Sequence, residues 1–367
     1  MTGARVVPRP AGAYYRWDCQ GERARAMADL QDGRGGLQWP SIHGDPVKAA
    51  EAIVAANPRP ERARVVFTIF NAGMFHGPGK IQPVVFLPPF CAVLASHGVA
   101  SHFVSTVEGL AVRTGPRSVV VHIYREVGCD LVTPEIIDAQ KDSLIFNAPE
   151  TGRVIADKMA TNRLLARHGI PVPALAEGHE SRIFSNSVSD SGARIQLLRA
   201  GAPLDPERYN TEFIDTRVRV EGKSYLTTIR LLCVDRHILH AYVRASEVSP
   251  EGRLSVHAID TPLDPALIEH LQATLVVPRM QELADIARRL ADVLGPGFYA
   301  HDLLVRRGTG EIYVCESGFK FHDWSYGNRI KPIADALPSH RIMLTPEHAS
   351  RSAELFLQAC RERGLRP

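Results

Sequence analysis

Residues 298–318 read FYAHDLLVRRGTGEIYVCESG, two apolar runs on either side of Gly308-Thr309-Gly310. Apolar runs joined by a short loop that contains glycine predict a β-hairpin. A three-residue loop places Gly310 where a left-handed residue is needed and sets Asp302 directly opposite Glu316. A four-residue loop shifts the pairing by one residue and puts the two carboxylates on opposite faces. The sequence leaves both registers open.

The opposed carboxylates have a chemical consequence in the three-residue register, which also sets Leu304 opposite Val314. The Cβ atoms of such a pair are roughly 5 Å apart. Two carboxylates at that spacing repel each other unless a positive charge lies between them. Hard oxygen ligands suit a Mg²⁺ ion that bridges phosphate oxygens. Asp302 and Glu316 are therefore candidate metal ligands.

The composition is that of an ordinary globular protein. The chain has 367 residues, of which 45% are hydrophobic and 23% charged. This length is enough for two or three domains, and this composition excludes disordered, collagenous and coiled-coil chains. Against 40 Asp and Glu there are 43 Lys and Arg, a net charge of +3. That surplus is too small to neutralise many phosphates, so no nucleic-acid partner is expected.

Cysteine spacing and hydropathy predict a cytoplasmic protein. The six cysteines lie far apart without a CxxC pair, which is typical of reduced thiols inside the cell. The first residues, Met-Thr-Gly-Ala-Arg, begin no apolar signal segment. The longest stretch without Asp, Glu, Lys or Arg starts at Ile81, and Pro83, Pro88 and Pro89 interrupt it. No membrane partner is therefore expected.

The order of apolar runs predicts an α/β chain. After a segment rich in Arg, Gly and Pro, short β-branched runs at helix-length intervals predict a parallel sheet. These runs span 65–70, 101–107, 118–124 and 144–146. A helix is expected over 150–167, and apolar periodicity predicts an amphipathic helix over 278–294. Hairpin-like strands are expected between the two helices, at 181–184, 193–198, 211–220, 225–234 and 238–245.

Two phosphate-loop templates fail on residues 71–80, NAGMFHGPGK. A Walker A loop needs Gly at Met74 and Ser or Thr at Ile81, and a dinucleotide fingerprint needs Gly at Gln82. A different α/β nucleotide-binding enzyme that uses Gly77-Pro78-Gly79-Lys80 stays open as an alternative.

Two further motifs carry a family resemblance. DKMATNRLL at 157–165, followed by GIPVP at 169–173, resembles the entry helix and turn of the ATP-grasp superfamily. Within it, the resemblance is to glutathione-synthetase-like and RimK-like carboxylate–amine ligases. The matching parts run in the family's order from Leu144 to Gly318. The resemblance implies the ATP-grasp fold, with an N-terminal parallel α/β domain, a small lid subdomain and a C-terminal, mainly antiparallel sheet with helices.

The resemblance also implies a division of the chain. Residues 1–62 are expected to form an N-terminal extension and residues 63–157 the N-terminal α/β domain. The ATP-grasp domain is expected over 158–345, with its lid at about 172–215, and a C-terminal helix over 346–367.

The resemblance assigns roles to individual residues. Lys158 is expected to reach the nucleotide phosphates, and Arg230 lies where the family places an arginine on the transferred phosphate. Asp302 and Glu316 lie where it places the magnesium ligands. Further ATP contacts are expected on the lid loop and beside the adenine, at Ser185, Ser187, Ser189, Ser191, Gly192, Glu212, Phe213, Ile214 and Asp215. Candidate substrate contacts near the ends of the same sheet are Arg244, Ser246, Lys320, His322 and Asp323.

Two positions depart from the family pattern. The family's second lysine, on the strand before the lid loop, aligns with Ser185, and Arg182 or Arg194 are its expected substitutes. The asparagine of the family's E-x-N motif is Gly318.

The resemblance implies an ATP-dependent carboxylate–amine ligase, in which ATP and Mg²⁺ convert a carboxylate into an acyl phosphate that an amine then attacks. The implied partners are ATP, a small carboxylate and an amine such as an amino acid or peptide, with a homodimer as one form of assembly. The two departures support an alternative, a degenerate ATP-grasp protein that binds nucleotide without ligase turnover.

Overall fold

The computed structural model describes residues 55, 63–68, 87–123, 133–188, 195–248, 256–345 and 347–365. Nearly all of the expected extension and the loop at 71–80 lie outside these ranges. Of the expected nucleotide contacts, Ser189, Ser191 and Gly192 lie outside the described residues, as does Arg194.

A parallel sheet forms the first part of the described chain, with the strand order β2-β1-β3-β4. Its strands are β1 (Ala63–Thr68), β2 (Val99–Val104), β3 (Ser118–His122) and β4 (Leu144–Phe146). The chain between them forms α4 (Leu87–Ser96), α5 (Val107–Ala111) and α6 (Pro134–Gln140). The inner strand β3 is buried along its whole length, as a β-branched strand of a covered parallel sheet should be. The parallel α/β layer expected from the sequence is confirmed.

Two helices replace the single helix expected over 150–167. They are α7 (Pro149–Ile155) and α8 (Lys158–Arg167). Between them Asp157 has extended backbone angles, φ −107° and ψ 108°, and its carboxylate accepts a backbone hydrogen bond from the first turn of α8 at 2.9 Å. A carboxylate at this position caps the following helix and so favours a break over a continuous helix. The break makes Lys158 the first residue of α8.

A small antiparallel sheet, which we call the lid sheet, has the order β6-β5-β7. Its strands are β5 (Arg182–Ser187), β6 (Gln196–Arg199) and β7 (Arg208–Glu212). The single strand expected over 211–220 is wrong, because β7 ends at Glu212 and β8 (Arg217–Val220) pairs with a different sheet. Asp215 lies at the break, where its carboxylate accepts hydrogen bonds from the backbone and the guanidinium of Arg217. Such a bond from Asp to the chain two residues on favours a turn.

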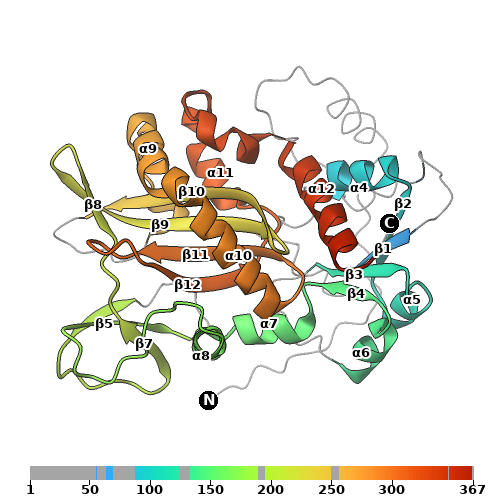
Figure 1. The fold of residues 1–367 in the computed structure, drawn as a ribbon, viewed down its shortest axis with the longest axis horizontal. Helices are drawn as coiled ribbons and strands as arrows, with labels where there is room; N and C mark the ends of the chain where they lie inside the picture. The colour runs from blue at the N-terminus through green and yellow to red at the C-terminus, as the bar shows by residue number, and fades with distance from the viewer. Residues whose placement is uncertain are drawn as a thin grey trace, which may run out of the picture.

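The large sheet is antiparallel, with the order β10-β9-β11-β12 and β8 beside the start of β9 (Figure 1). Its long strands are β9 (Lys223–Val234), β10 (His237–Glu247), β11 (Phe298–Val305) and β12 (Ile312–Phe319). Helix α10 (Met280–Leu294) lies across one face and buries Leu283, Ile286 and Leu290 there. The expected amphipathic helix is confirmed, with a later start because residues 277–279 form a 3₁₀ turn.

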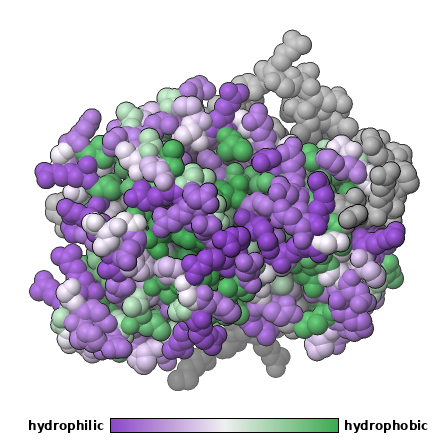
Figure 2. Space-filling model, viewed as in Figure 1, coloured by the Kyte–Doolittle hydropathy of each residue, from purple (hydrophilic) through white to green (hydrophobic). Residues whose placement is uncertain are grey.

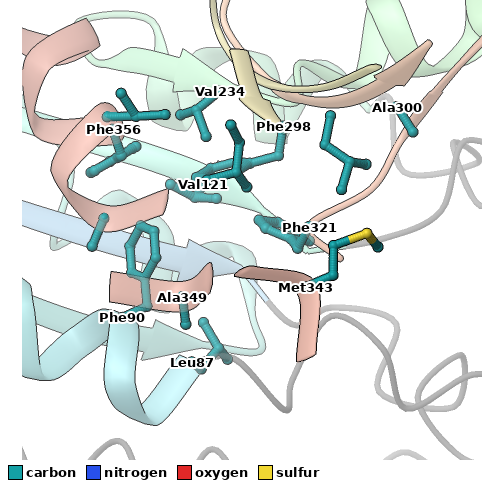
Figure 3. Packing of buried hydrophobic residues seen from close by; sticks show 14 of the residues in the cluster. Leu87, Phe90, Val121, Val234, Phe298, Ala300, Phe321, Met343, Ala349 and Phe356 are labelled. Carbon is teal, nitrogen blue, oxygen red and sulfur yellow. The ribbon is translucent and has the colours of Figure 1, made fainter. Parts of the chain in front are cut away.

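Aromatic side chains join these parts into one core (Figure 3). The ring of Phe356, on α12 (Glu347–Glu362), has its centroid 5.5 Å from that of Phe90, 4.8 Å from Phe146 and 5.9 Å from Phe298. These residues come from α4, β4 and β11. Helix α12 therefore closes a core that the parallel sheet and the large sheet share.

Shorter helical segments complete the described chain. They are Ala258–Asp260, α9 (Pro265–Leu271), Gln272–Val276, α11 (Trp324–Ile330), Lys331–Ala336 and Pro338–Leu344. The face of the molecule seen in Figure 2 mixes hydrophilic side chains with smaller apolar areas. Among the residues that the structure describes, no helix is both long and apolar enough to cross a bilayer.

Candidate active site

The hairpin that carries the candidate metal ligands has a four-residue loop. Arg306 N donates a hydrogen bond to Glu311 O at 2.8 Å, and Gly310 N donates one to Arg306 O at 2.9 Å. The loop is therefore Arg307 to Gly310, one residue longer than in the register that opposes the two carboxylates.

A β-bulge nevertheless brings the carboxylates together. Val314 pairs with Leu303 and not with Leu304, as the longer loop requires. The next pair is Asp302 and Glu316, because the bulge adds one residue to β12 between the two pairs. Val314 lies in the core beneath α10, so the extra residue turns Glu316 to the opposite face. Of the two registers that the sequence left open, the structure has the loop of the longer one and the carboxylate pairing of the shorter one.

Four residues on neighbouring strands form a line across the large sheet, which we call the charged row. Glu316 on β12 lies opposite Asp302 on β11, Asp302 opposite Arg230 on β9, and Arg230 opposite Tyr242 on β10. Directly opposed residues of a sheet point to the same face. Because α10 packs on the alternate residues of these strands, the charged row lies on the face that α10 does not cover.

Two arginines hold the carboxylate of Asp302. Arg230 donates from Nε to Oδ1 at 2.7 Å and from Nη2 to Oδ2 at 2.6 Å, and Arg244 Nη2 donates to Oδ1 at 2.9 Å. Burial alone would raise the pKa of Asp302, but the two guanidinium groups outweigh it and hold the pKa below its usual value. Arg230 and Arg244, on the strands across from Glu316, thus neutralise Asp302 and offset the repulsion expected between the opposed carboxylates.

A second buried carboxylate, Asp323 before α11, extends the row. Its Oδ2 accepts hydrogen bonds from Arg230 Nη1 at 2.9 Å and from the hydroxyl of Tyr242, and Lys320 Nζ lies 3.7 Å from Oδ1. The side chain is 1% exposed. Burial raises the pKa of Asp323, but Lys320 and Arg230 lower it further, so the group is ionised. Arg230 therefore bridges two carboxylates that lie on different elements.

Lys158 and Glu316 form the other end of the site. Lys158 Nζ lies 3.8 Å from Glu316 Oε1, and the side chain of Glu316 is 45% exposed. Lys158 N donates to Val188 O at 3.1 Å, which ties the start of α8 to the residue after β5. The structure thus brings together the expected phosphate ligand and one expected metal ligand.

Charge is unevenly divided in this cluster. We call the charged row, together with Lys158, Arg244, Lys320 and Asp323, the charged cluster. It carries four cationic and three anionic side chains. Burial lowers the pKa of Lys320, which Asp323 opposes. Arg244 is 5% exposed, and its Nε has no hydrogen-bond partner among the described residues. A surplus of buried positive charge with an unused donor is suited to an anion.

The expected adenine contacts lie at the junction of the lid sheet with the large sheet. Glu212 Oε2 accepts a hydrogen bond from Arg306 Nη2 at 2.8 Å, and its Oε1 accepts one from Ala174 N at 3.2 Å. Asp215 is held by Arg217. The two residues between them are buried or half-buried: Phe213 and Ile214.

The remaining expected contacts differ in their surroundings. Ser246 is buried two residues after Arg244, on the same face of β10. His322 is buried, and its Nε2 bonds to Met343 O at 2.9 Å, a contact within the core. Ser187 N donates to the side chain of Asn186 at 2.8 Å. Ser185 is 1% exposed, and its hydroxyl accepts a hydrogen bond from Arg208.

Two residues of the site were missed by sequence reasoning, Tyr242 and Arg208. Tyr242 precedes Arg244 by two residues, so strand alternation places both on one face and could have revealed it. Arg208 lies on β7, and its contact with β5 depends on the pairing of those strands. No pattern within the sequence signals that pairing.

The carboxylates fit a divalent cation only in part. Glu316 presents a half-exposed carboxylate, whereas both oxygens of Asp302 already accept hydrogen bonds from guanidinium groups. Among the described residues, no three His, Cys, Asp or Glu side chains gather as a metal site. A cation at Asp302 would lie next to the charges of Arg230 and Arg244, which is unfavourable unless an anion accompanies it. The donor set thus fits Mg²⁺ as a bridge to phosphate and does not fit a free ion.

Comparison with known proteins finds similarity in fold alone. No protein-family model matches the sequence, and no curated protein is significantly similar to it. A RimK domain ATP-grasp protein from Sphaerobacter thermophilus has a TM-score of 0.41 at 16% identity, over 80% of this chain and 99% of its own. D-alanine–D-alanine ligase from Bacillus anthracis, in complex with ATP, has 0.46 at 13% identity, over 83% and 100%. L-amino acid ligase from Bacillus licheniformis has 0.41 at 13% identity, over 78% and 75%. In fold, the chain is similar to this ATP-grasp protein and to these two ligases.

Proposed function

We propose that this chain is an ATP-dependent carboxylate–amine ligase whose reaction takes place at the charged cluster. The observation that carries the proposal is the line Glu316, Asp302, Arg230 and Tyr242 across the large sheet, with Lys158 at one end. The family resemblance assigned Lys158, Arg230, Asp302 and Glu316 to ATP and magnesium, and Tyr242 is the addition. A single face therefore holds the groups that phosphoryl transfer requires.

In this proposal the γ-phosphate of ATP passes to a substrate carboxylate, and an amine then displaces phosphate from the acyl phosphate to form an amide. Lys158 and Arg230 bind phosphate oxygens and stabilise the charge that spreads over them in transfer. Asp302 and Asp323 fix the plane of the Arg230 guanidinium through bonds of 2.6 to 2.9 Å. The protein contributes position and charge and forms no covalent bond to the substrate.

Magnesium enters the proposal together with the nucleotide. When bound, the ion neutralises phosphate oxygens, and Glu316 with Asp302 would hold it. Because the charged cluster already has one more positive than negative side chain, a free cation is disfavoured and a polyanion is favoured. We therefore expect Mg²⁺ to bind measurably in the presence of ATP and not alone.

Arg244 and Lys320 are proposed to bind the substrate carboxylate. Arg244 is buried with an unused Nε donor, and Lys320 is the most exposed cation beside Asp323, with 28% of its side chain accessible. An unpaired buried donor is unfavourable, so an anionic oxygen at this point gains a charge-assisted hydrogen bond. Phe213 and Ile214 are proposed to face the adenine through their backbone, with Glu212 and Asp215 beside the ribose.

ADP release with mixtures of amino acids and small carboxylates tests the proposal. We expect sustained ADP release only when both a carboxylate and an amine are present, because the carboxylate alone yields one ADP per acyl phosphate formed, and we expect Arg230→Lys to lose at least about tenfold in turnover. Arg236→Lys, on the partly exposed loop between β9 and β10, serves as the matched control and should retain the rate. A rate of ATP hydrolysis that is the same with and without the two substrates would contradict a ligase.

One observation favours a second function, nucleotide binding without turnover. The oxygens of Asp302 are both engaged by arginines, and Gly318 stands where the family's E-x-N motif has its asparagine. In that case calorimetry shows ATP binding, while no combination of substrates releases ADP. The two functions are thus separated by the same pair of measurements.

A further inference from the structure

The lid sheet carries a cation, Arg208, next to Ser185, which is the position where this chain lacks the family's lysine. Ser185 Oγ accepts a hydrogen bond from Arg208 Nε at 2.8 Å, and Arg208 Nη2 lies 3.4 Å from Ser185 O. In the pairing of β5 with β7, Arg208 lies opposite Ser187, and Ser185 lies opposite Asn210. The side chain of Arg208 therefore extends along β7 toward Glu212 and ends over Ser185.

Arg208 lies on the face of the lid sheet that is directed to the large sheet. Residues 208, 210 and 212 alternate with their neighbours and share one face of β7. On that face Glu212 accepts a hydrogen bond from Arg306, the residue directly after β11. Tyr209 points to the other face, where its hydroxyl accepts a hydrogen bond from Asn162 of α8 at 3.0 Å. Arg208 is thus directed toward the sheet that carries the charged row.

Arg182, one of the two substitutes expected for the missing lysine, is placed differently. It is exposed at the beginning of β5 and lies opposite Arg199 of β6. Strand alternation puts it on the face opposite to that of Ser185. The other substitute, Arg194, lies outside the described residues.

We infer that Arg208 supplies, from β7, the phosphate-binding cation that the family carries on β5, and that Ser185 is the residue that orients it. The inference rests on the proposed function, because it concerns the lid side of the same nucleotide site. A guanidinium that is fixed through Nε presents a planar edge to a phosphate and binds two oxygens at once. Ser185 and Arg208 then form one unit, in which the small hydroxyl leaves room for the guanidinium.

The inference makes residues 185 and 208 interdependent. Ser185→Lys alone places a second cation next to Arg208, and the two side chains repel each other. Ser185→Lys together with Arg208→Ala leaves one cation, on β5, as in the family arrangement. A cation is needed at this point of the lid, and either strand can carry it.

Calorimetry with ATP and with adenosine tests the inference on the full chain. We expect Arg208→Ala to weaken ATP binding by about tenfold or more, the usual effect of a lost charge-assisted hydrogen bond, and to leave adenosine binding unchanged. Arg182→Ala, on the same strand pair but the opposite face, should bind both ligands like the wild type. Arg208→Gln should behave like Arg208→Ala, and it provides the measurement if the alanine variant does not fold.

The double variant Ser185→Lys with Arg208→Ala gives the decisive comparison. We expect it to recover most of the ATP affinity that Arg208→Ala loses, while Ser185→Lys alone binds ATP no better than the wild type. Unchanged ATP binding in Arg208→Ala, or an equal loss of ATP and adenosine binding, overturns the inference and leaves the proposed function intact. A wild-type chain that binds neither ligand overturns both.

Discussion

The large sheet carries a network of charged side chains, whereas the lid sheet contains one short strand that is poorly buried. Asp302 on the large sheet and Asp323 beside it are each bound by at least two partners from different strands or loops, and their side chains are 14% and 1% exposed. On the lid sheet, β6 is four residues long, and its residues are exposed or half-buried. Buried ion-pair networks resist local opening, whereas short strands with few buried contacts open readily. The difference indicates a rigid set of charges on the large sheet and a lid sheet whose strand β6 opens more readily.

Acidification should destabilise the body of the molecule more than any single substitution. Burial lowers the pKa of His122 and His240 to about 4, and that of His301 and His340 to about 3. The pKa of an unfolded histidine is about 6.5, so the unfolded chain takes up protons first. Stability is then complete above pH 6.5 and falls as the pH decreases, by about 2 kcal/mol per histidine at pH 5.

Urea unfolding at pH 7.5 and pH 5 measures this effect. His122→Gln, which cannot be protonated, should show a smaller loss between the two pH values. The strands of the lid sheet contain no histidine, so local opening of the lid should depend little on pH in this range. Equal stability at the two pH values would contradict the burial of these rings.

Removal of Arg230 should have the largest effect of any substitution in the charged cluster. Arg230→Met leaves Asp302 and Asp323 without their shared partner, and breaking a buried pair in this way destabilises by about 3–5 kcal/mol. Arg351 also forms an ion pair, at 2.9 Å with Glu354, but more than half of its side chain is exposed. Arg351→Met should therefore change the free energy of unfolding by less than about 1 kcal/mol. Similar losses of unfolding free energy in the two variants would contradict the distinction between the buried and the exposed ion pair.

The two opposed carboxylates should respond unequally to neutralisation. Asp302→Asn removes an anion that two arginines hold, so we expect a loss of about 2 kcal/mol or more. Glu316→Gln removes a half-exposed charge 3.8 Å from Lys158, so we expect a change within about 0.5 kcal/mol. The melting temperatures of the two variants without ligand test this asymmetry. If the two carboxylates repelled each other, both variants would melt at a higher temperature than the wild type.

The smallest effect is expected where the two sheets meet. The ion pair of Glu212 with Arg306, at 2.8 Å, joins two side chains that are 25% and 29% exposed. Glu212→Gln should lower global stability by less than about 1 kcal/mol, and it should increase hydrogen exchange at the lid amides. Faster exchange in β9 or β11 instead would show that the lid and the large sheet open together.

Local patterns in the sequence predicted the elements better than the contacts between them. The parallel layer, α10 and the hairpin follow from periodicity and turn residues, which act over a few positions. The bulge in β12 leaves no such mark, because one inserted residue looks like any other position of the strand. Asp157 and Asp215 ended elements early through side-chain bonds to nearby residues, and periodicity does not register such bonds.

The structure brings together several residues that the sequence assigned to the candidate site, but the sequence predicted neither their bonding nor the presence of Tyr242 and Arg208. The partner of Asp302 on β9, Arg230, lies 72 residues away in the chain, so the ion pair depends on the order of strands in the sheet. The contact of Arg208 with Ser185 depends in the same way on the lid pairing. The domain boundaries and the roles of the individual residues stay predictions.

Helix α12 has a consequence for the order in which the protein matures. Phe356 fills a space between Phe90, Phe146 and Phe298, and these rings are 0–1% exposed once it is in place. A ribosome synthesises these three residues well before Phe356, so the nascent chain carries an open aromatic surface until α12 emerges. During that interval the surface is available to chaperones and to other nascent chains. The step that commits the chain to its native form therefore follows the synthesis of α12.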